Sequence, residues 1–454
     1  MTHEERMGSM PIKKLLLQLS VPTITAQLIN ALYNIVDRVY IGHIEGVGGT
    51  ALTSLGVCFP LLMLISATSV LISAGGAARA AISMGRGDHD NAEKILGNAA
   101  SALLLISAVL FVIFFFFKEQ LLYLFGASDV TYPFASSYFS IYLFGTPFVQ
   151  ISLGLNTFIT TQGFTNVSMK TVMIGAIINI ILDPIFILFF DMGVSGAALA
   201  TIISQGISAL WVLKFLSGNK TILKIRKKHL KIDPKVLAPC MALGFAPFIM
   251  QSTESLIMLC FNNSLLKYGG DVAVGAMTVL SSAMQMVMMP LQGLTQGAQP
   301  IISYNFGARN ADRVRDAFKL LLKCCLTYSA CAWALCMVFP RQIGGVFTDN
   351  QAIIDVVSWA LRVYMGGTII FGAQIACQQT FVALGNAKTS AFLAIFRKII
   401  VLVPLIFILP PLFPAEGKVF AVWLAEPVAD VLAVTMTTTL FRKQFKESMA
   451  QLEQ

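Results

Sequence analysis

Charged residues are scarce in this chain. Lys, Arg, Asp and Glu make up 12% of its 454 residues, about half of the roughly 25% that is typical of soluble domains. Hydrophobic residues make up 56%, and the mean hydropathy is +0.75. This composition excludes a soluble globular fold and indicates an all-α polytopic membrane protein. No long polar segment remains between the apolar runs to form a separate soluble domain.

The sequence also lacks the motifs of common enzymes. It has no Walker lysine motif, no HExxH and no GxSxG, so ATP hydrolysis and the usual hydrolytic chemistries lose their support. Eight cysteines are present, but none has zinc or CxxC spacing, and four of them, Cys324, Cys325, Cys331 and Cys336, fall in one apolar segment. We interpret them as small hydrophobic residues and expect neither a metal site nor a cofactor.

Apolar runs of about 20 residues are long enough to cross a bilayer as helices. Twelve such runs are predicted, at 15–41, 52–82, 95–117, 133–161, 171–190, 194–216, 236–266, 273–303, 317–339, 356–384, 389–412 and 419–441. No cleavable small-residue site follows the first run, so we expect it to remain as helix one.

Basic residues are concentrated on one side of these predicted helices. They lie before helix one, after helices two and eight, after helix twelve and, most densely, in the linker at 217–235. Because Lys and Arg are retained on the cytoplasmic side, both termini are predicted to be cytoplasmic. This asymmetry, together with contact with anionic membrane lipid, accounts for the net charge of +9, so nucleic acid is not expected as a partner.

The chain repeats itself at a spacing of about 222 residues. Gly85 and Gly307 follow helices two and eight in similar polar segments, and Gly163 matches Gly385 at the same spacing. We therefore predict two pseudo-twofold-related six-helix lobes that enter the membrane in the same sense. The predicted divisions are an N-terminal lobe (1–216), a basic linker (217–235), a C-terminal lobe (236–441) and a cytoplasmic tail (442–454).

Polar side chains form stripes on several predicted helices. On helix one they step by three or four residues, which places them on one face; similar stripes occur on helices eight and ten. Such residues can simply join helices by hydrogen bonds, but several stripes together favour a water-accessible cavity. The candidate cavity residues are Gln27, Asn30, Asn34, Gln292, Gln374 and Gln378.

One carboxylate stands out within helix five. Asp183 lies in an apolar run, Asn179 is one turn earlier, and Pro184 leaves the Ile180 carbonyl without its usual N–H donor. These oxygen groups suit a proton or a small cation, with Asp37 as a candidate companion carboxylate. The alternative is a structural Asp satisfied by neighbouring hydroxyl groups.

Two motifs resemble the multidrug and toxic compound extrusion (MATE) transporters, most closely the MepA-like and DinF-like bacterial branch. They are NIVDRVYIGHIEGVGGTAL at 34–52 and QGAQPIISYNFGARNADRVRDAF at 296–318. The resemblance implies an antiporter of the bacterial cytoplasmic membrane that exports cationic amphipathic drugs in exchange for protons, with sodium as the alternative ion. It places the ion-coupling site at Asp37, Asn156, Asn179, Asp183 and Thr201. We expect the protein to function as a monomer.

The C-terminal half departs from one pattern in this family. NorM-like relatives use a Glu on helix seven and an Asp on helix ten; Glu254 matches the first, but helix ten has no acid. This departure argues against a sodium site there. We expect Glu254 to stand alone and to attract cationic substrate, with Met258, Phe261 and Met289 as apolar contacts.

Two other functions remain open from the sequence. Arg397 and Lys398, deep in helix eleven, would suit a lipid-linked oligosaccharide flippase of the same superfamily, whose pyrophosphate needs a cationic cavity. An intramembrane lipid-modifying enzyme would need a nucleophile or metal constellation, and no such pattern is apparent. We therefore expect a transporter rather than an enzyme.

Overall fold

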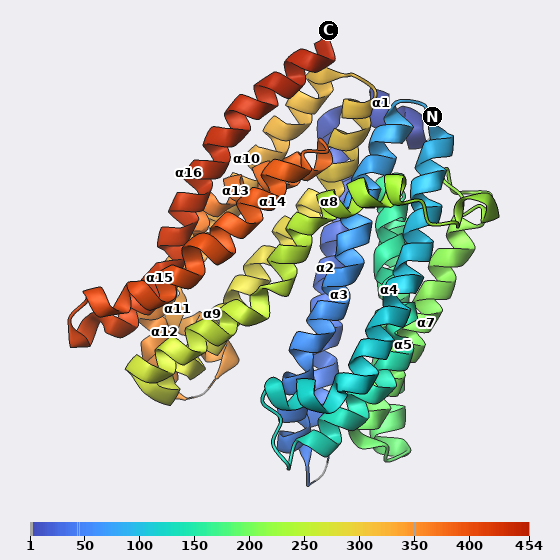
Figure 1. Ribbon diagram of the computed structural model, residues 1–454. Helices are drawn as coiled ribbons and strands as arrows, with labels where there is room; N and C mark the ends of the chain where they lie inside the picture. Colours follow the sequence, from blue (N-terminus) through green and yellow to red (C-terminus); the bar gives the residue numbers. More distant parts are fainter. Residues whose placement is uncertain (1–2, 43, 45, 349, 454) are drawn as a thin grey trace.

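The computed structural model describes residues 3–42, 44, 46–348 and 350–453, and most of these residues are helical (Figure 1). The first half of the chain contains a short N-terminal helix, six long helices and one π-helical turn. In order these are α1 (His3–Ser9), α2 (Ile12–Gly42), α3 (Gly48–Gly85), α4 (His89–Leu124), α5 (Tyr132–Thr161), α6 (Thr165–Pro184), η1 (Ile185–Phe189) and α7 (Gly193–Leu216).

The second half has more interruptions. After the short 3₁₀ turn η2 (Lys227–His229) in the linker, its elements are α8 (Pro234–Ser252), α9 (Glu254–Gly307), α10 (Ala311–Val338), α11 (Pro340–Phe347), α12 (Gln351–Tyr364), α13 (Thr368–Ala383), α14 (Ala387–Ile395), the π-helical η3 (Phe396–Leu402), α15 (Val403–Ile408), the 3₁₀ turns η4 (Pro410–Leu412) and η5 (Ala415–Gly417), and α16 (Lys418–Glu453).

Ten helical segments among the described residues are long and apolar enough to cross a membrane. The number is eleven if α12 and α13, bent by 51°, form one span. The segment 234–307 counts once although it holds 74 residues, which is far beyond the roughly 20 needed for one crossing. Its backbone is non-helical at Gly270, so two crossings are accommodated there, as the predicted runs 236–266 and 273–303 require.

Some predicted helices are not continuous. The run predicted at 356–384 is broken between α12 and α13 at Gly366–Gly367, where the backbone passes close to another helix: a Cβ on Gly367 would lie 2.6 Å from Asp430 Oδ2. The run predicted at 389–412 changes from α14 to the π-helical η3 and back to α15. Proline, glycine and close packing explain such breaks in membrane helices.

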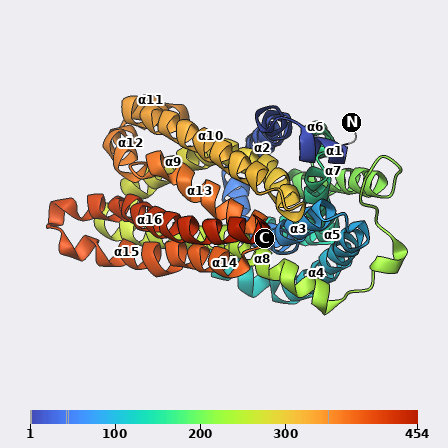
Figure 2. The same cartoon turned by 90° about the horizontal axis from the view of Figure 1, so that it is seen from above.

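Two bundles diverge from a common end. In Figure 1 the blue-to-green N-lobe (residues 12–216) lies beside the yellow-to-red C-lobe (residues 234–453), and both termini and the linker lie at the end where the lobes meet. Figure 2 shows the same separation from above. Contacts between the lobes are made chiefly by α3 with α8 and α9, and by α2 with α9. The outer surfaces are apolar, as lipid requires; Phe116 and Phe189, for example, are 73% and 81% exposed.

The same turn occurs twice in the backbone, 222 residues apart. Asp88 caps the N-terminus of α4 by accepting the Asn91 N–H, and Asn310 caps α10 by accepting the Arg313 N–H. In front of each cap the chain takes a left-handed conformation, at Gly87 (φ 76°) and Arg309 (φ 57°). Equivalent geometry at equivalent positions shows that the sequence repeat is also a structural repeat.

The motif at 296–318 connects the N-terminus to the C-lobe. Arg313 donates from Nη2 to the Met7 and Met10 carbonyls at 3.0 and 2.8 Å, and from Nε to Asn305 Oδ1 at 3.0 Å. Asn305 in turn donates to the Met7 carbonyl at 3.0 Å. The polar residues of this motif therefore fix α1 against the C-lobe.

Candidate ion-coupling and substrate sites

Two carboxyl groups meet inside the N-lobe. Asp37 on α2 and Asp183 at the end of α6 lie close enough for a side-chain hydrogen bond, which forms only when one of them holds a proton. Asn179 lies one turn before Asp183 and donates from Nδ2 to its Oδ1 at 3.2 Å. Asp183 is fully buried, and Asp37 and Asn179 are 8% and 2% exposed.

The backbone after Asp183 explains how the pair is accommodated. Pro184 ends α6, and the chain continues as the π-helical turn η1. A proline cannot donate to the carbonyl one turn before it, and π-helical turns often occur at functional sites. The missing N–H donor noted in the sequence at Pro184 thus coincides with a π-helical turn.

Several buried oxygen atoms around this pair have no hydrogen-bond donor among the described residues. They are Asp37 Oδ1, Asn156 Oδ1, Asn179 Oδ1 and Asp183 Oδ2. Buried polar atoms are normally satisfied, and carboxylate and amide oxygens are suitable partners for a proton or a hard cation. The arrangement can therefore take up a small positive charge.

The other two predicted ion-coupling residues make local contacts. Asn156 donates to the Ser168 carbonyl at 3.3 Å, and Thr201 donates to the Ala197 carbonyl at 3.0 Å. The structure thus brings Asp37, Asn179 and Asp183 into direct contact. Involvement of Asn156 and Thr201 in coupling stays a prediction.

Three tyrosines that the sequence prediction did not include lie near the acidic pair. Tyr33 is close enough to Asp37 and Asp183 to interact electrostatically with both, and Tyr138 is close to Asp37. Tyr142 packs on Tyr138, with ring centroids 6.2 Å apart. Tyr33 precedes Asp37 by four residues on the same helical face, so this spacing could have revealed it.

Some residues of the predicted polar stripes form hydrogen bonds within the protein, and others are exposed. Gln27 donates from Nε2 to Gln296 Oε1 at 3.2 Å and so links α2 to α9. Asn34 is exposed and donates to the Asn30 carbonyl at 2.7 Å. Gln292 is exposed, and Asn30, Met258 and Met289 are partly so. These side chains are at least partly uncovered, and their role in substrate binding stays a prediction.

Three other predicted substrate residues are buried. Phe261 is fully buried and packs on Tyr364, with ring centroids 5.9 Å apart. Gln374 and Gln378 are 3% and 4% exposed, and Gln378 donates to the Ser390 carbonyl at 2.8 Å. Neighbouring helices cover these three side chains in this conformation, and their role in substrate binding stays a prediction.

The expectation that Glu254 stands alone is wrong. Its carboxylate forms an ion pair with Lys398, which reaches it from η3. The sequence showed that helix ten has no acid, but it could not show that a cation on helix eleven would take the partner's place.

Arg397 is likewise paired. Its Nη2 lies 2.8 Å from Glu426 Oε1 and 2.7 Å from Asp430 Oδ1, and its guanidinium stacks over the Phe371 ring at 4.5 Å. Glu426 and Asp430 were not singled out from the sequence, although two acids at a spacing of four within an apolar helix are a strong signal.

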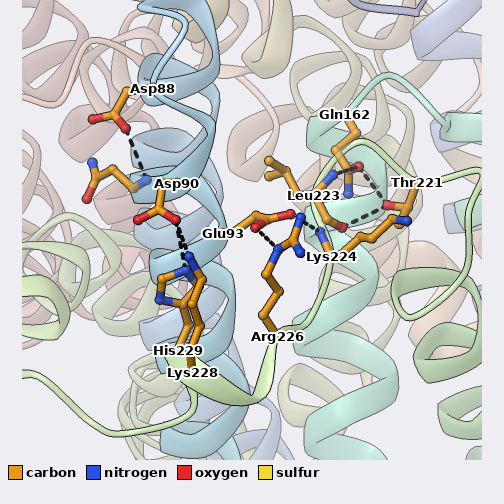
Figure 3. Close-up of polar contacts among 11 residues, drawn as sticks. Asp88, Asp90, Glu93, Gln162, Thr221, Leu223, Lys224, Arg226, Lys228 and His229 are labelled. Atoms are coloured by element: carbon orange, nitrogen blue, oxygen red, sulfur yellow. Dashed lines mark hydrogen bonds and ion pairs between the residues drawn. The ribbon is translucent and has the colours of Figure 1, made fainter.

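The basic linker is folded onto the N-lobe (Figure 3). Glu93 accepts the Lys224 N–H at 3.2 Å and pairs with Arg226, while Asp90 pairs with Lys228 at 2.5 Å and with His229 at 3.3 Å. Asp90, Glu93 and His229 lie close enough to hold a metal ion. Both carboxylates, however, already have basic partners, which favours an ion-pair network.

Further contacts fix both ends of the linker to the N-lobe. Gln162 Oε1 accepts hydrogen bonds from Thr221 Oγ1 and from the Ile222 and Leu223 N–H groups, each at 2.8 Å (Figure 3). Lys94 lies 2.7 Å from Asp233 and, by this hydrogen bond, holds the pKa of the Asp233 carboxyl below its usual value. The linker is therefore a docked element of the N-lobe.

A protein-family model decides which family the chain belongs to. The MatE model matches residues 22–185 and 247–408, more than half of the chain and both lobes. The chain is a MATE family transporter. This membership confirms the resemblance inferred from the two motifs and the expectation of a transporter rather than an enzyme.

The similarity of this MATE transporter to known proteins extends over nearly its full length. It is 24% identical over 434 residues to the multidrug export protein MepA of Staphylococcus aureus strain N315, covering 95% of this chain and 94% of MepA. A crystal structure of MATE in the bent conformation matches with a TM-score of 0.92 at 21% identity over 100% of both chains. An outward-facing multidrug resistance MATE family transporter of the MOP superfamily matches with a TM-score of 0.91 at 22% identity over 98% of both chains. The all-α polytopic fold is thereby confirmed.

Proposed function

We propose that this MATE transporter is a secondary active multidrug efflux antiporter that exports cationic amphipathic compounds in exchange for protons by alternating access. The cargo class is supported by the similarity to MepA, which is named a multidrug export protein. It is also supported by the acidic residues Asp37 and Glu254 in the two lobes. We further propose a bacterial cytoplasmic membrane location, cytoplasmic termini and function as a monomer.

The close approach of the Asp37 and Asp183 carboxyl groups carries this proposal. Two carboxyl groups in a low-dielectric site resist ionising together, so they titrate as a coupled pair. Loss of the shared proton would replace an attraction by a repulsion between α2 and α6. A change in protonation can therefore alter the packing of two helices of the N-lobe. Sodium would also fit the oxygen atoms, but two carboxyl groups this close together favour a shared proton.

The flippase alternative loses the feature that favoured it. Arg397 and Lys398 do not present free positive charge, because Glu426, Asp430 and Glu254 are paired with them. A pyrophosphate group would have to displace three carboxylates. This site favours a cationic cargo over an anionic one.

An Asp183→Asn variant tests the proposed function. The amide keeps the volume of the side chain and can accept or donate hydrogen bonds, but it cannot release a proton. We expect it to abolish coupled efflux of a cationic dye from proteoliposomes while the protein folds and inserts. Asp191→Asn is the matched control, because Asp191 is exposed beyond η1. Near-normal efflux by correctly inserted Asp183→Asn protein would contradict the role of this carboxyl group.

A further inference from the structure

Five charged side chains form one cluster in the C-lobe. Arg397 and Lys398 come from η3, Glu254 from the first turn of α9, and Glu426 and Asp430 from α16. Arg397 contacts Glu426 and Asp430 at 2.8 and 2.7 Å, and Lys398 contacts Glu254.

The charges of this cluster do not balance. Two cations face three carboxylates, which leaves one negative charge when all five groups are ionised. In addition, Asp430 Oδ2 is buried without a hydrogen-bond donor among the described residues. Because uncompensated charge is costly to bury, the cluster favours one further positive group.

Only one carboxylate of this cluster is accessible from outside. The Glu254 side chain is 68% exposed, whereas the side chains of Lys398, Glu426 and Asp430 are 8%, 6% and 1% exposed. A cation that approaches the C-lobe therefore reaches Glu254 first. Lys398 already occupies the inner side of that carboxylate.

The two lobes place these groups on corresponding helices. In the N-lobe, Asp37 and Asp183 lie on the first and fifth long helices, next to the π-helical η1 and Pro184. In the C-lobe, Arg397 and Lys398 lie within the π-helical η3, shortly before Pro404. Each lobe thus has a π-helical turn on its fifth long helix, after Pro184 in the N-lobe and before Pro404 in the C-lobe, and such turns often occur at functional sites.

We propose that Lys398 is a tethered cation in the substrate site of the C-lobe, and that the cationic group of the cargo replaces it at Glu254. This inference rests on the proposed export of organic cations. It adds a residue that determines affinity, Lys398, and narrows the cargo at this site to monovalent amphipathic cations.

Exchange of one cation for another suits a transporter that must also release its cargo. A lysine has a flexible stem and a compact charge, and Glu426 is close enough to Lys398 to interact electrostatically with it. Lys398 can therefore turn inward when cargo arrives and return to Glu254 when cargo leaves.

Equilibrium binding of tetraphenylphosphonium to purified protein in lipid nanodiscs tests the exchange. Lys398→Gln removes the competitor, so we expect binding to become about tenfold tighter, in line with the coupling energies of close charge pairs. Lys398→Arg should weaken binding several-fold, because a guanidinium holds a carboxylate more firmly. Glu254→Gln should weaken binding, and Lys398→Gln should give no gain when added to it. Lys443→Gln, which removes an exposed lysine of α16, is the matched control and should leave binding unchanged.

Unchanged or weaker binding by folded Lys398→Gln protein would overturn the inference, as would an equal gain in the Glu254→Gln background. If Lys398→Gln does not fold, Lys398→Arg decides: weaker binding supports the exchange, and unchanged or tighter binding overturns it. The proposed function is judged separately. Wild-type protein that exports the cation while these variants bind it normally would contradict this inference alone, whereas wild-type protein that neither binds nor exports organic cations would contradict both.

Discussion

Gly85 and Gly307 lie against each other's helices where the two lobes meet. A Cβ on Gly85 would lie 1.9 Å from the Tyr304 carbonyl oxygen, and a Cβ on Gly307 would lie 2.0 Å from the Ile82 carbonyl oxygen. The ends of α3 and α9 therefore meet backbone to backbone, which no residue with a Cβ permits without a shift. Closure of the lobes at this end depends on these two glycines.

Gly85→Ala and Gly307→Ala should open this end of the molecule. Overpacking of a close contact costs about 1–3 kcal/mol, so the population with separated lobes should rise by a factor of about 5 to 150. Cys240 reports on the same boundary: it is 2% exposed on α8, and its carbonyl lies near Gly75 of α3. In a background where Cys240 is the sole cysteine, maleimide should therefore label Cys240 faster in either glycine variant than in the protein with both glycines.

Gly56→Ala is the control for this experiment. Gly56 lies on the same helix, and a Cβ there would have no neighbour within 4 Å, so labelling of Cys240 should not change. Equal labelling rates in the Gly85→Ala, Gly307→Ala and Gly56→Ala variants would contradict the role of the glycine contact in closure.

Asn179→Ala should slow proton-coupled efflux without abolishing it. The amide of Asn179 donates to Asp183 at 3.2 Å, and a hydrogen bond to a charged group is worth about 1.5–3 kcal/mol. Its loss should lower the rate of efflux at saturating dye by about ten- to 150-fold, since 1.4 kcal/mol corresponds to a factor of ten. Rates measured in proteoliposomes check this, and an efflux rate equal to that of wild-type protein would show that Asn179 only supports packing.

Asp430→Asn should destabilise the C-lobe strongly. Asp430 Oδ1 accepts from both Nε and Nη2 of Arg397 in a fully buried position. Removing one partner of a buried ion pair typically costs about 3–5 kcal/mol. Thermal unfolding of the purified protein should show this loss, with Glu416→Gln as an exposed control. A melting temperature within a degree of wild type would mean that the cluster contributes little to stability.

Glu93→Gln should loosen the linker. Glu93 is 5% exposed and holds both the Lys224 N–H and the Arg226 guanidinium, so loss of its charge weakens both contacts. Trypsin should then cleave the linker more quickly after its basic residues. Glu119→Gln, an exposed change at the opposite end of α4, should leave the cleavage rate unaltered, and equal rates in the two variants would contradict the docked linker.

The sequence predicted the architecture well because lipid imposes simple rules on it. Long apolar runs and a 222-residue repeat do not depend on side-chain packing, and both led to the correct class of fold. Asp183 was found for the same reason, since a carboxylate in an apolar helix is conspicuous. Its contact with Asp37 followed from the polar face of helix one.

The C-lobe cluster could not be predicted from single helices. Arg397 and Lys398 appeared as unmatched positive charges, because their partners lie on α9 and α16. Glu254 appeared isolated for the same reason. Phe261 was assigned to the substrate surface by its helical face, but neighbouring helices bury it. Which charges pair, and which apolar faces are covered, depends on tertiary packing that a sequence pattern does not contain.

Identifying the ion whose gradient drives efflux is the most direct test of the proposed proton antiport. Dye efflux should be measured in proteoliposomes of uniform orientation under a pH gradient with equal sodium on both sides, and separately under a sodium gradient at equal pH. The closely placed carboxyl groups of Asp37 and Asp183 predict efflux driven by the pH gradient and abolished in Asp183→Asn protein. Efflux driven by the sodium gradient and not by the pH gradient would contradict the proposal.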